Sequence, residues 1–228
     1  MNITRLVAGA AVAAGLLACG STPPPPAWQQ RAHDASDDAV QAYLQGEQRV
    51  AQQQWRKAFD AVAATGDVQR LARMVLLQCA AQTAALQWSD CPAYAPLEPG
   101  AAGAEQAYAR YLQAQHTARD VALLPPGQQA ALAQRTGTPP VLRSLPPGQP
   151  PLSQLTAAAV ALRAGALAPA AANAAMLLAA EHGWRRAAMA WAQYLHQQAL
   201  QQGDAAGAAA LAQRLQILQS PQGGVAQP

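Results

Sequence analysis

Aromatic and charged residues are both scarce in this sequence. Only 5% of its 228 residues are aromatic and 12% are charged. β-Branched residues are scattered and nowhere alternate with polar residues over the length of a strand, which argues against a β-sheet. Ala, Leu and Gln predominate instead, and they favour helices because they lose little side-chain entropy there. The composition therefore predicts an all-α fold.

Dense clusters of positive charge are missing as well. The formal net charge is +3, and the only close basic pairs are Arg56-Lys57 and Arg185-Arg186. Proteins that bind nucleic acids usually carry larger clusters of Lys and Arg. Short basic pairs on helices are usually solvated, so we expect both pairs at the surface and no nucleic-acid partner.

The chain also lacks an uninterrupted apolar run long enough to cross a bilayer, which takes about 20 residues. Its first apolar run, residues 6–18, follows a short positive segment that ends at Arg5, and this arrangement is typical of an export signal. We therefore expect residues 1–18 to be a signal peptide. Removal of the signal peptide also removes Arg5, so the net side-chain charge of the mature chain is +2.

The end of this signal carries a specific motif. Leu16-Leu17-Ala18-Cys19 has an aliphatic residue three positions before a cysteine and a small residue just before it. The motif resembles the lipobox of bacterial lipoproteins. The resemblance implies cleavage before Cys19, a diacylglyceryl group on its sulfur and a further fatty acid, such as palmitate, on its amine. The alternative is an ordinary secretory signal that leaves Cys19 free.

Lipid modification would give the chain a membrane link without a spanning helix. Each buried methylene contributes about 0.8 kcal/mol, so two or three acyl chains anchor a protein durably. The residue after Cys19 is Gly20, and an Asp at this position would resemble an inner-membrane retention signal. The resemblance therefore implies a lipid-anchored protein on the periplasmic face of the outer membrane.

The mature chain divides into a tether, a helical domain and a tail. Residues 19–35 contain four consecutive prolines and are expected to form an extended tether. Residues 36–219 form the helical domain, in which residues 136–151 are too rich in Pro for regular structure and form a loop or linker. Residues 220–228 are expected to be a disordered tail.

Amphipathic periodicity predicts the helices of this domain. Ser36, followed by two aspartates, has the form of a helix start, and Gly66-Asp67 indicates a helix end followed by a new N-cap. The first segment is therefore either one long helix or a hairpin bent near Gly46. The later helices are expected at residues 68 to about 88, 104–117, 126–135, 152–163, 169–181, 184–202 and 204–218.

Glycine separates apolar-periodic segments at Gly46, Gly165 and Gly203, and Ala58 lies twelve residues after Gly46. These positions resemble tetratricopeptide-type repeats, in which a small residue lets two antiparallel helices approach each other. The resemblance implies antiparallel helical hairpins. No 34-residue period recurs and the capping Pro of that repeat is absent, so an irregular helical bundle is the alternative.

Cys79 and Cys91 are the two cysteines left after lipidation of Cys19. An oxidising periplasm favours a disulfide between them over two free thiols. An unbroken helix would hold their Cα atoms about 18 Å apart, far beyond the reach of a disulfide. A break near Trp88, supported by Pro92, is therefore a condition for the bond.

No residue pattern identifies a catalytic, metal or cofactor site. No His lies near either cysteine, and no phosphate-binding loop or nucleophile motif is present. The four histidines fit no ligand or triad spacing, and we expect each at the surface: His33, His116, His182 and His196.

Aromatic residues fall on single faces of two predicted helices, Trp184 with Trp191 and Trp55 with Phe59. Such stripes are usually core, and a Trp-lined partner groove is the alternative.

These features favour a monomeric scaffold lipoprotein that binds another envelope protein, without enzymatic activity and without a cofactor. The alternative is a cell-envelope enzyme, for example one active on peptidoglycan, with a site that sequence spacing does not reveal.

Overall fold

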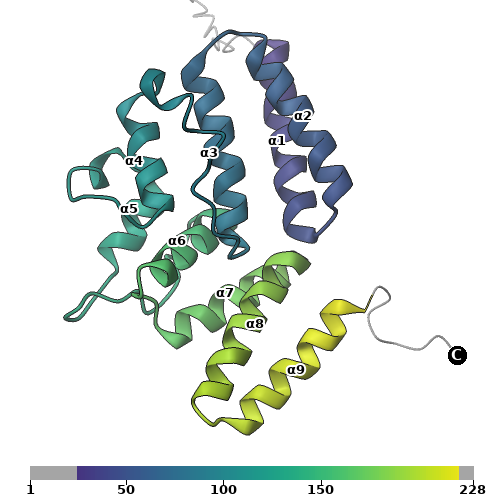
Figure 1. Ribbon diagram of the computed structural model, residues 1–228, viewed down its shortest axis with the longest axis vertical. Helices are drawn as coiled ribbons and strands as arrows, with labels where there is room; N and C mark the ends of the chain where they lie inside the picture. The colour runs from purple at the N-terminus through teal and green to yellow at the C-terminus, as the bar shows by residue number, and fades with distance from the viewer. Residues whose placement is uncertain (1–24, 221–228) are drawn as a thin grey trace, which may run out of the picture.

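The computed structural model describes residues 25–220, and this part of the chain is all-α (Figure 1). The predicted fold class is confirmed. Isolated bridges, at residues 136, 141, 142 and 167, are the only β-type pairing within the described range. No helix in that range is long and apolar enough to cross a membrane. The elements, in chain order, are α1 (Ala27–Gln45), α2 (Gln48–Ala63), α3 (Val68–Ala84), η1 (Glu98–Gly100), α4 (Gly103–Leu112), η2 (Val121–Leu123), α5 (Pro126–Ala133), α6 (Pro151–Arg163), α7 (Pro169–Glu181), α8 (Arg185–Gln201) and α9 (Ala205–Gln219).

The helix α3 lies at the centre of the upper half of the molecule (Figure 1). The α1–α2 hairpin lies on one side of it and α4 on the other, and α6 also packs against it. The remaining helices α7, α8 and α9 follow one another in the lower half, each packed against the next. The helix α8 also contacts α1, so the C-terminal helices lie against the N-terminal hairpin.

The three glycines singled out in the sequence each lie between two helices that pack together. Gly46 ends α1 with a φ of 95°, a left-handed conformation that glycine adopts without steric cost. The chain therefore forms a hairpin here rather than one long helix. Gly66 and Gly183 make similar turns between α2 and α3 and between α7 and α8, so glycine marks the short helix connections in general.

The start of the first helix differs from the prediction. The helix α1 begins at Ala27, directly after Pro26, and Ser36 lies in its middle, where its hydroxyl donates to the carbonyl of His33 at 2.9 Å. Residues 27–35 are therefore helix and not tether. Proline fixes only its own φ and is compatible with a helix that starts immediately after it. Packing then holds the first turns, because Ala32 and Ala35 are buried and Trp28 lies under the Arg70 guanidinium.

Two hydrophobic cores share α3. We call the first the Ala–Trp core; it is built from α1, α2, α6, α7 and α8 and contains the buried residues Trp55, Trp184 and Trp191. We call the second the Tyr–disulfide core; it lies around α4 and contains Tyr94, Tyr111, Cys79 and Cys91. One side of α3 enters each core, which explains why most of the residues from Ala72 to Ala84 are buried.

The Pro-rich segment 136–151 is a loop, as predicted, but it is not a free linker. Leu142 is fully buried, and its N–H donates to the carbonyl of Ala166 while its carbonyl accepts from the N–H of Ala168. These bonds fasten the loop to the segment between α6 and α7. The domain therefore continues through the loop instead of dividing there.

Candidate functional site

The two cysteines of the domain form a disulfide. Cys79 on α3 is bonded to Cys91, and their Cα atoms are 5.9 Å apart. The predicted break is present, because α3 ends at Ala84 and the chain then turns back, with Leu86 and Cys91 both in the left-handed region. Cys19 and the rest of the lipobox-like motif lie outside the described residues.

Two of the four histidines, His116 and His196, are half-buried and not the surface residues that we expected, and His116 has the more unusual surroundings. The ring of His116 is half-buried, and its centroid lies 5.4 Å from that of the buried Tyr111. Its Nδ1 is buried and has no hydrogen-bond partner in the described part of the chain. Burial lowers the pKa of His116, and the nearby Arg135 lowers it further. Sequence spacing gave no sign of this contact because Tyr111 and His116 meet through a loop.

The tryptophan stripes are core, so the idea of a Trp-lined partner groove is wrong. Trp191 is fully buried and donates from its indole nitrogen to the carbonyl of Ala84 at 3.1 Å. Trp184 is 2% exposed and donates to Gln41 Oε1 at 2.6 Å. These bonds hold α8 against the end of α3 and against α1.

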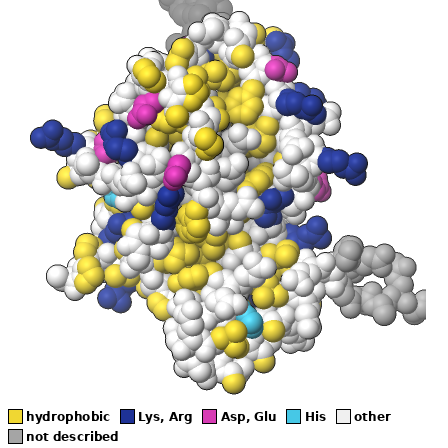
Figure 2. Space-filling model, in the orientation of Figure 1, with side chains coloured by type: hydrophobic (Ala, Val, Ile, Leu, Met, Phe, Trp, Pro, Cys, Tyr) yellow, Lys and Arg dark blue, Asp and Glu magenta, His cyan; other side chains and the backbone are white. Residues whose placement is uncertain are grey.

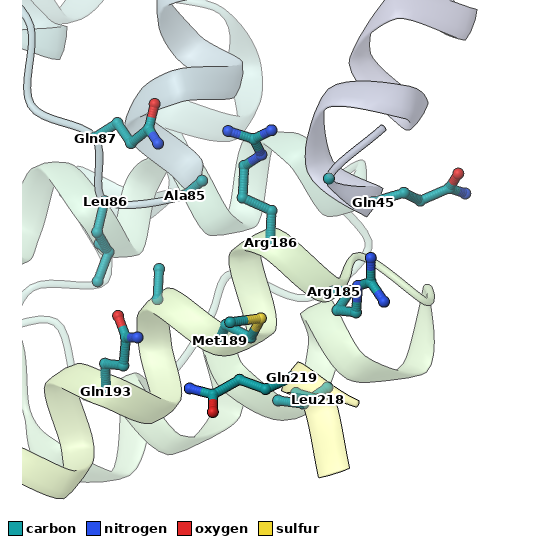
Figure 3. A pocket seen from close by; sticks show the side chains of 12 residues that line it. Gln45, Ala85, Leu86, Gln87, Arg185, Arg186, Met189, Gln193, Leu218 and Gln219 are labelled. Carbon is teal, nitrogen blue, oxygen red and sulfur yellow. The ribbon is translucent and has the colours of Figure 1, made fainter. Parts of the chain in front are cut away.

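A cleft opens where four separate segments meet, and we call it the Arg–Gln cleft (Figure 3). It encloses about 600 Å³ between the end of α1, the segment after α3, the first half of α8 and the end of α9. Its polar lining consists of Gln45, Gln87, Arg185, Arg186, Gln193 and Gln219. Its apolar lining includes Leu86, Met189 and Leu218.

Arg186 is the charge of this cleft that contacts neighbouring side chains. Its guanidinium carbon lies 4.5 Å from the centroid of the Tyr43 ring, and it donates to Gln48 Oε1 at 2.8 Å. In Figure 3 its side chain extends from α8 toward the end of α3 and the α1–α2 hairpin. The Tyr43 hydroxyl in turn donates to Gln87 Oε1 at 2.5 Å. Burial raises the pKa of Tyr43, against the opposing effect of Arg186, so the hydroxyl stays a neutral donor.

The charged residues that line the cleft are all positive. Arg185 and Arg186 line it, and no carboxylate is among its described lining residues. Amide side chains both donate and accept hydrogen bonds, which matches the alternating groups of a peptide backbone. Guanidinium groups bind carboxylates with paired hydrogen bonds. The arrangement can therefore hold an extended segment that carries an acidic group.

The sequence reading of the basic pairs was partly wrong. Arg56, Lys57 and Arg185 are exposed, as expected, but Arg186 is half-buried. Nothing in the local spacing distinguishes the two arginines, because the difference arises from Tyr43 of α1 and Gln48 at the start of α2, which contact Arg186. On the face drawn in Figure 2, Lys and Arg side chains are scattered and hydrophobic side chains gather in patches between them.

Among the described residues, no group of three His, Cys, Asp or Glu side chains is placed so that it could hold a metal ion. Comparisons with known proteins found no family model, no curated protein and no solved structure that matches this chain.

Proposed function

We propose that this chain is a lipid-anchored protein of the bacterial envelope that binds an acidic segment of another envelope protein in the Arg–Gln cleft. The observation that carries the proposal is the placement of Arg185 and Arg186 in a cleft without a lining carboxylate. The lipobox at residues 16–19 supports the envelope location.

The cleft is suited to a peptide rather than to a small compact ligand. It is open at the surface, and its donors and acceptors come from four segments that are far apart in sequence. Arg186 is already held by Tyr43 and Gln48, so little side-chain entropy is lost when a partner carboxylate binds. Arg185 is exposed and adds long-range attraction for an acidic segment.

Site-specific photocrosslinking in cells tests the proposal. A photoreactive residue replaces Gln193, which is exposed in the cleft, and the control replaces Gln52, an exposed glutamine of α2 that does not line the cleft. We expect one adduct with an identified envelope protein at position 193 and none at position 52. Mass spectrometry of the adduct should map the contact to an acidic segment.

Charge variants then link the adduct to the arginines. Arg185→Gln with Arg186→Gln removes both charges, and the adduct at position 193 should fall by about tenfold. Arg56→Gln with Lys57→Gln is the matched control and should leave the adduct unchanged. An adduct that survives the loss of Arg185 and Arg186, or that forms equally at position 52, would contradict the proposed binding mode.

The anchor is tested separately. Cys19→Ser removes the sulfur that would accept the diacylglyceryl group, so we expect unprocessed precursor and no fatty-acid incorporation. Lipid labelling of the Cys19→Ser chain at wild-type levels would refute the lipoprotein assignment and leave the cleft unaffected.

A further inference from the structure

A second pocket lies between α3 and α4 and shares no lining residue with the Arg–Gln cleft. Its volume is about 320 Å³, which is near the lower end of the range for small-molecule sites. Its walls are mostly apolar and include Leu76, Leu77, Leu123 and Pro125. Glu105 also lines it, and we therefore call it the Glu105 pocket.

Glu105 is an unusual residue for such walls. Its side chain is only 5% exposed, and one carboxylate oxygen, Oε1, pairs with the Arg73 guanidinium. The other oxygen, Oε2, is buried and has no hydrogen-bond partner among residues 25–220. A buried carboxylate oxygen without a donor destabilises a fold, because it loses its hydration without compensation. A ligand that brings a donor to Oε2 would remove this penalty.

We propose that the Glu105 pocket binds a small organic ammonium ion, a primary amine with an apolar body. Hydrogen bonds between charged groups are about twice as strong as those between neutral groups, so an ammonium is the donor that Oε2 binds best. The pocket's apolar walls accommodate the hydrocarbon part. This site is independent of the proposed partner-binding cleft.

The charges around the pocket are compatible with a cation. Arg73 is the one lining residue of like charge, and its side chain is 64% exposed, so solvent screens its repulsion. Tyr108 provides an aromatic wall, and aromatic rings attract ammonium groups. Burial raises the pKa of Tyr108, which keeps its hydroxyl neutral.

Binding of two probes of the same shape tests the proposal. Phenethylamine is protonated at neutral pH, and phenethyl alcohol is its neutral counterpart. Both are titrated into the purified full-length chain, and amide chemical shifts of α3 and α4 are followed by NMR. We expect the amine to bind at least tenfold more tightly than the alcohol. Equal affinity of the two probes, or no saturable shift with millimolar amine, would overturn the proposal.

Variants assign the binding to this pocket. Glu105→Gln should reduce amine affinity about tenfold and leave the alcohol unchanged. Arg73→Gln should leave amine affinity equal or higher, because it removes the repulsive charge, whereas general damage to the site would lower it. Ala104→Trp adds bulk at an exposed lining position and should abolish binding, and Ala209→Trp, at an exposed position of α9, is its control. Amine binding that persists in both Glu105→Gln and Ala104→Trp would refute the site.

Discussion

The Ala–Trp core and the Tyr–disulfide core differ in how regular the surrounding chain is and in how many cross-links it carries. The helices around the Ala–Trp core are joined mostly by turns of two to five residues. The Tyr–disulfide core contains two long irregular connections, residues 85–97 and 113–120. The disulfide lies there, as does every ion pair that links separate elements among the described residues, namely Arg73–Glu105, Arg110–Asp120 and Arg163–Asp90.

Chain regularity around one core and cross-links around the other compensate for each other. Alanine-rich helices approach closely, and short turns leave little chain to order, so a few buried tryptophans fill the remaining space. An irregular segment loses more conformational entropy for each contact that it makes. A disulfide and ion pairs between separate elements restrict such a segment where continuous helix packing is not available.

The largest expected effect is in the Ala–Trp core. Trp191→Ala removes a fully buried ring and leaves the carbonyl of Ala84 without its donor. We expect the free energy of unfolding to fall by about 3–5 kcal/mol, as measured by urea denaturation. Leu200→Ala, on the same helix but 53% exposed, is the control and should change it by less than about 0.5 kcal/mol. Similar losses for both variants would mean that Trp191 does not fill the core.

The disulfide is next in size. Cys79→Ala with Cys91→Ala opens a short loop, so the loop-entropy model gives a loss of about 3 kcal/mol and a melting temperature lower by several degrees. The protein should stay helical by circular dichroism. Hydrogen exchange should accelerate in residues 85–124 and not in α7 and α8. Two titratable thiols from Cys79 and Cys91 in unreduced periplasmic protein would contradict the disulfide.

A smaller effect is expected at the Arg110–Asp120 pair. The Arg110 guanidinium and the N–H of Thr117 donate to Asp120 and hold its pKa far below the ordinary 3.8. As the pH falls, the Asp120 carboxylate is therefore protonated in the unfolded chain before it is protonated in the folded chain. The stability that the pair contributes is complete above about pH 4 and is lost as the pH falls through the folded-state pKa of Asp120. Asp120→Asn should lower the free energy of unfolding at pH 7 by less than loss of the disulfide does. Below pH 4 it should flatten the dependence of the free energy of unfolding on pH. An unchanged acid profile would show that the pair contributes nothing.

The smallest effect is expected at His116. Its pKa lies below the ordinary 6.5, so the unfolded chain takes up a proton first as the pH falls. Stability should therefore decrease between about pH 7 and pH 5, and His116→Phe, which keeps the aromatic contact with Tyr111, should flatten that decrease. His182→Phe is the control, because this exposed ring belongs to the other half of the molecule. Equal flattening by both variants would show that burial of His116 is not the cause.

Sequence reasoning worked best where structure is set locally. The end of α2 and start of α3 follow from Gly66 and Asp67, and Asp67 caps α3 by accepting from the N–H groups of Gln69 and Arg70. The bounds of α7 were predicted to the residue. The beginning of α1 was missed because Ser36 has a cap-like context, whereas burial of Ala32 and Ala35 extends the helix back to Pro26.

Residue propensities and local caps were enough to predict the all-α class and the turns at Gly66, Gly165 and Gly203, and the sequence favoured a disulfide between Cys79 and Cys91 over two free thiols. The predicted helix ends near residue 88 and at residue 117 were wrong, because α3 ends at Ala84 and α4 at Leu112. Tertiary structure decided which of two adjacent arginines became a fixed part of a cleft, and it left one oxygen of Glu105 buried without a donor. The physical reason is that burial of a side chain depends on what packs over it. Here the covering helices come from distant parts of the chain, and no local pattern encodes their approach.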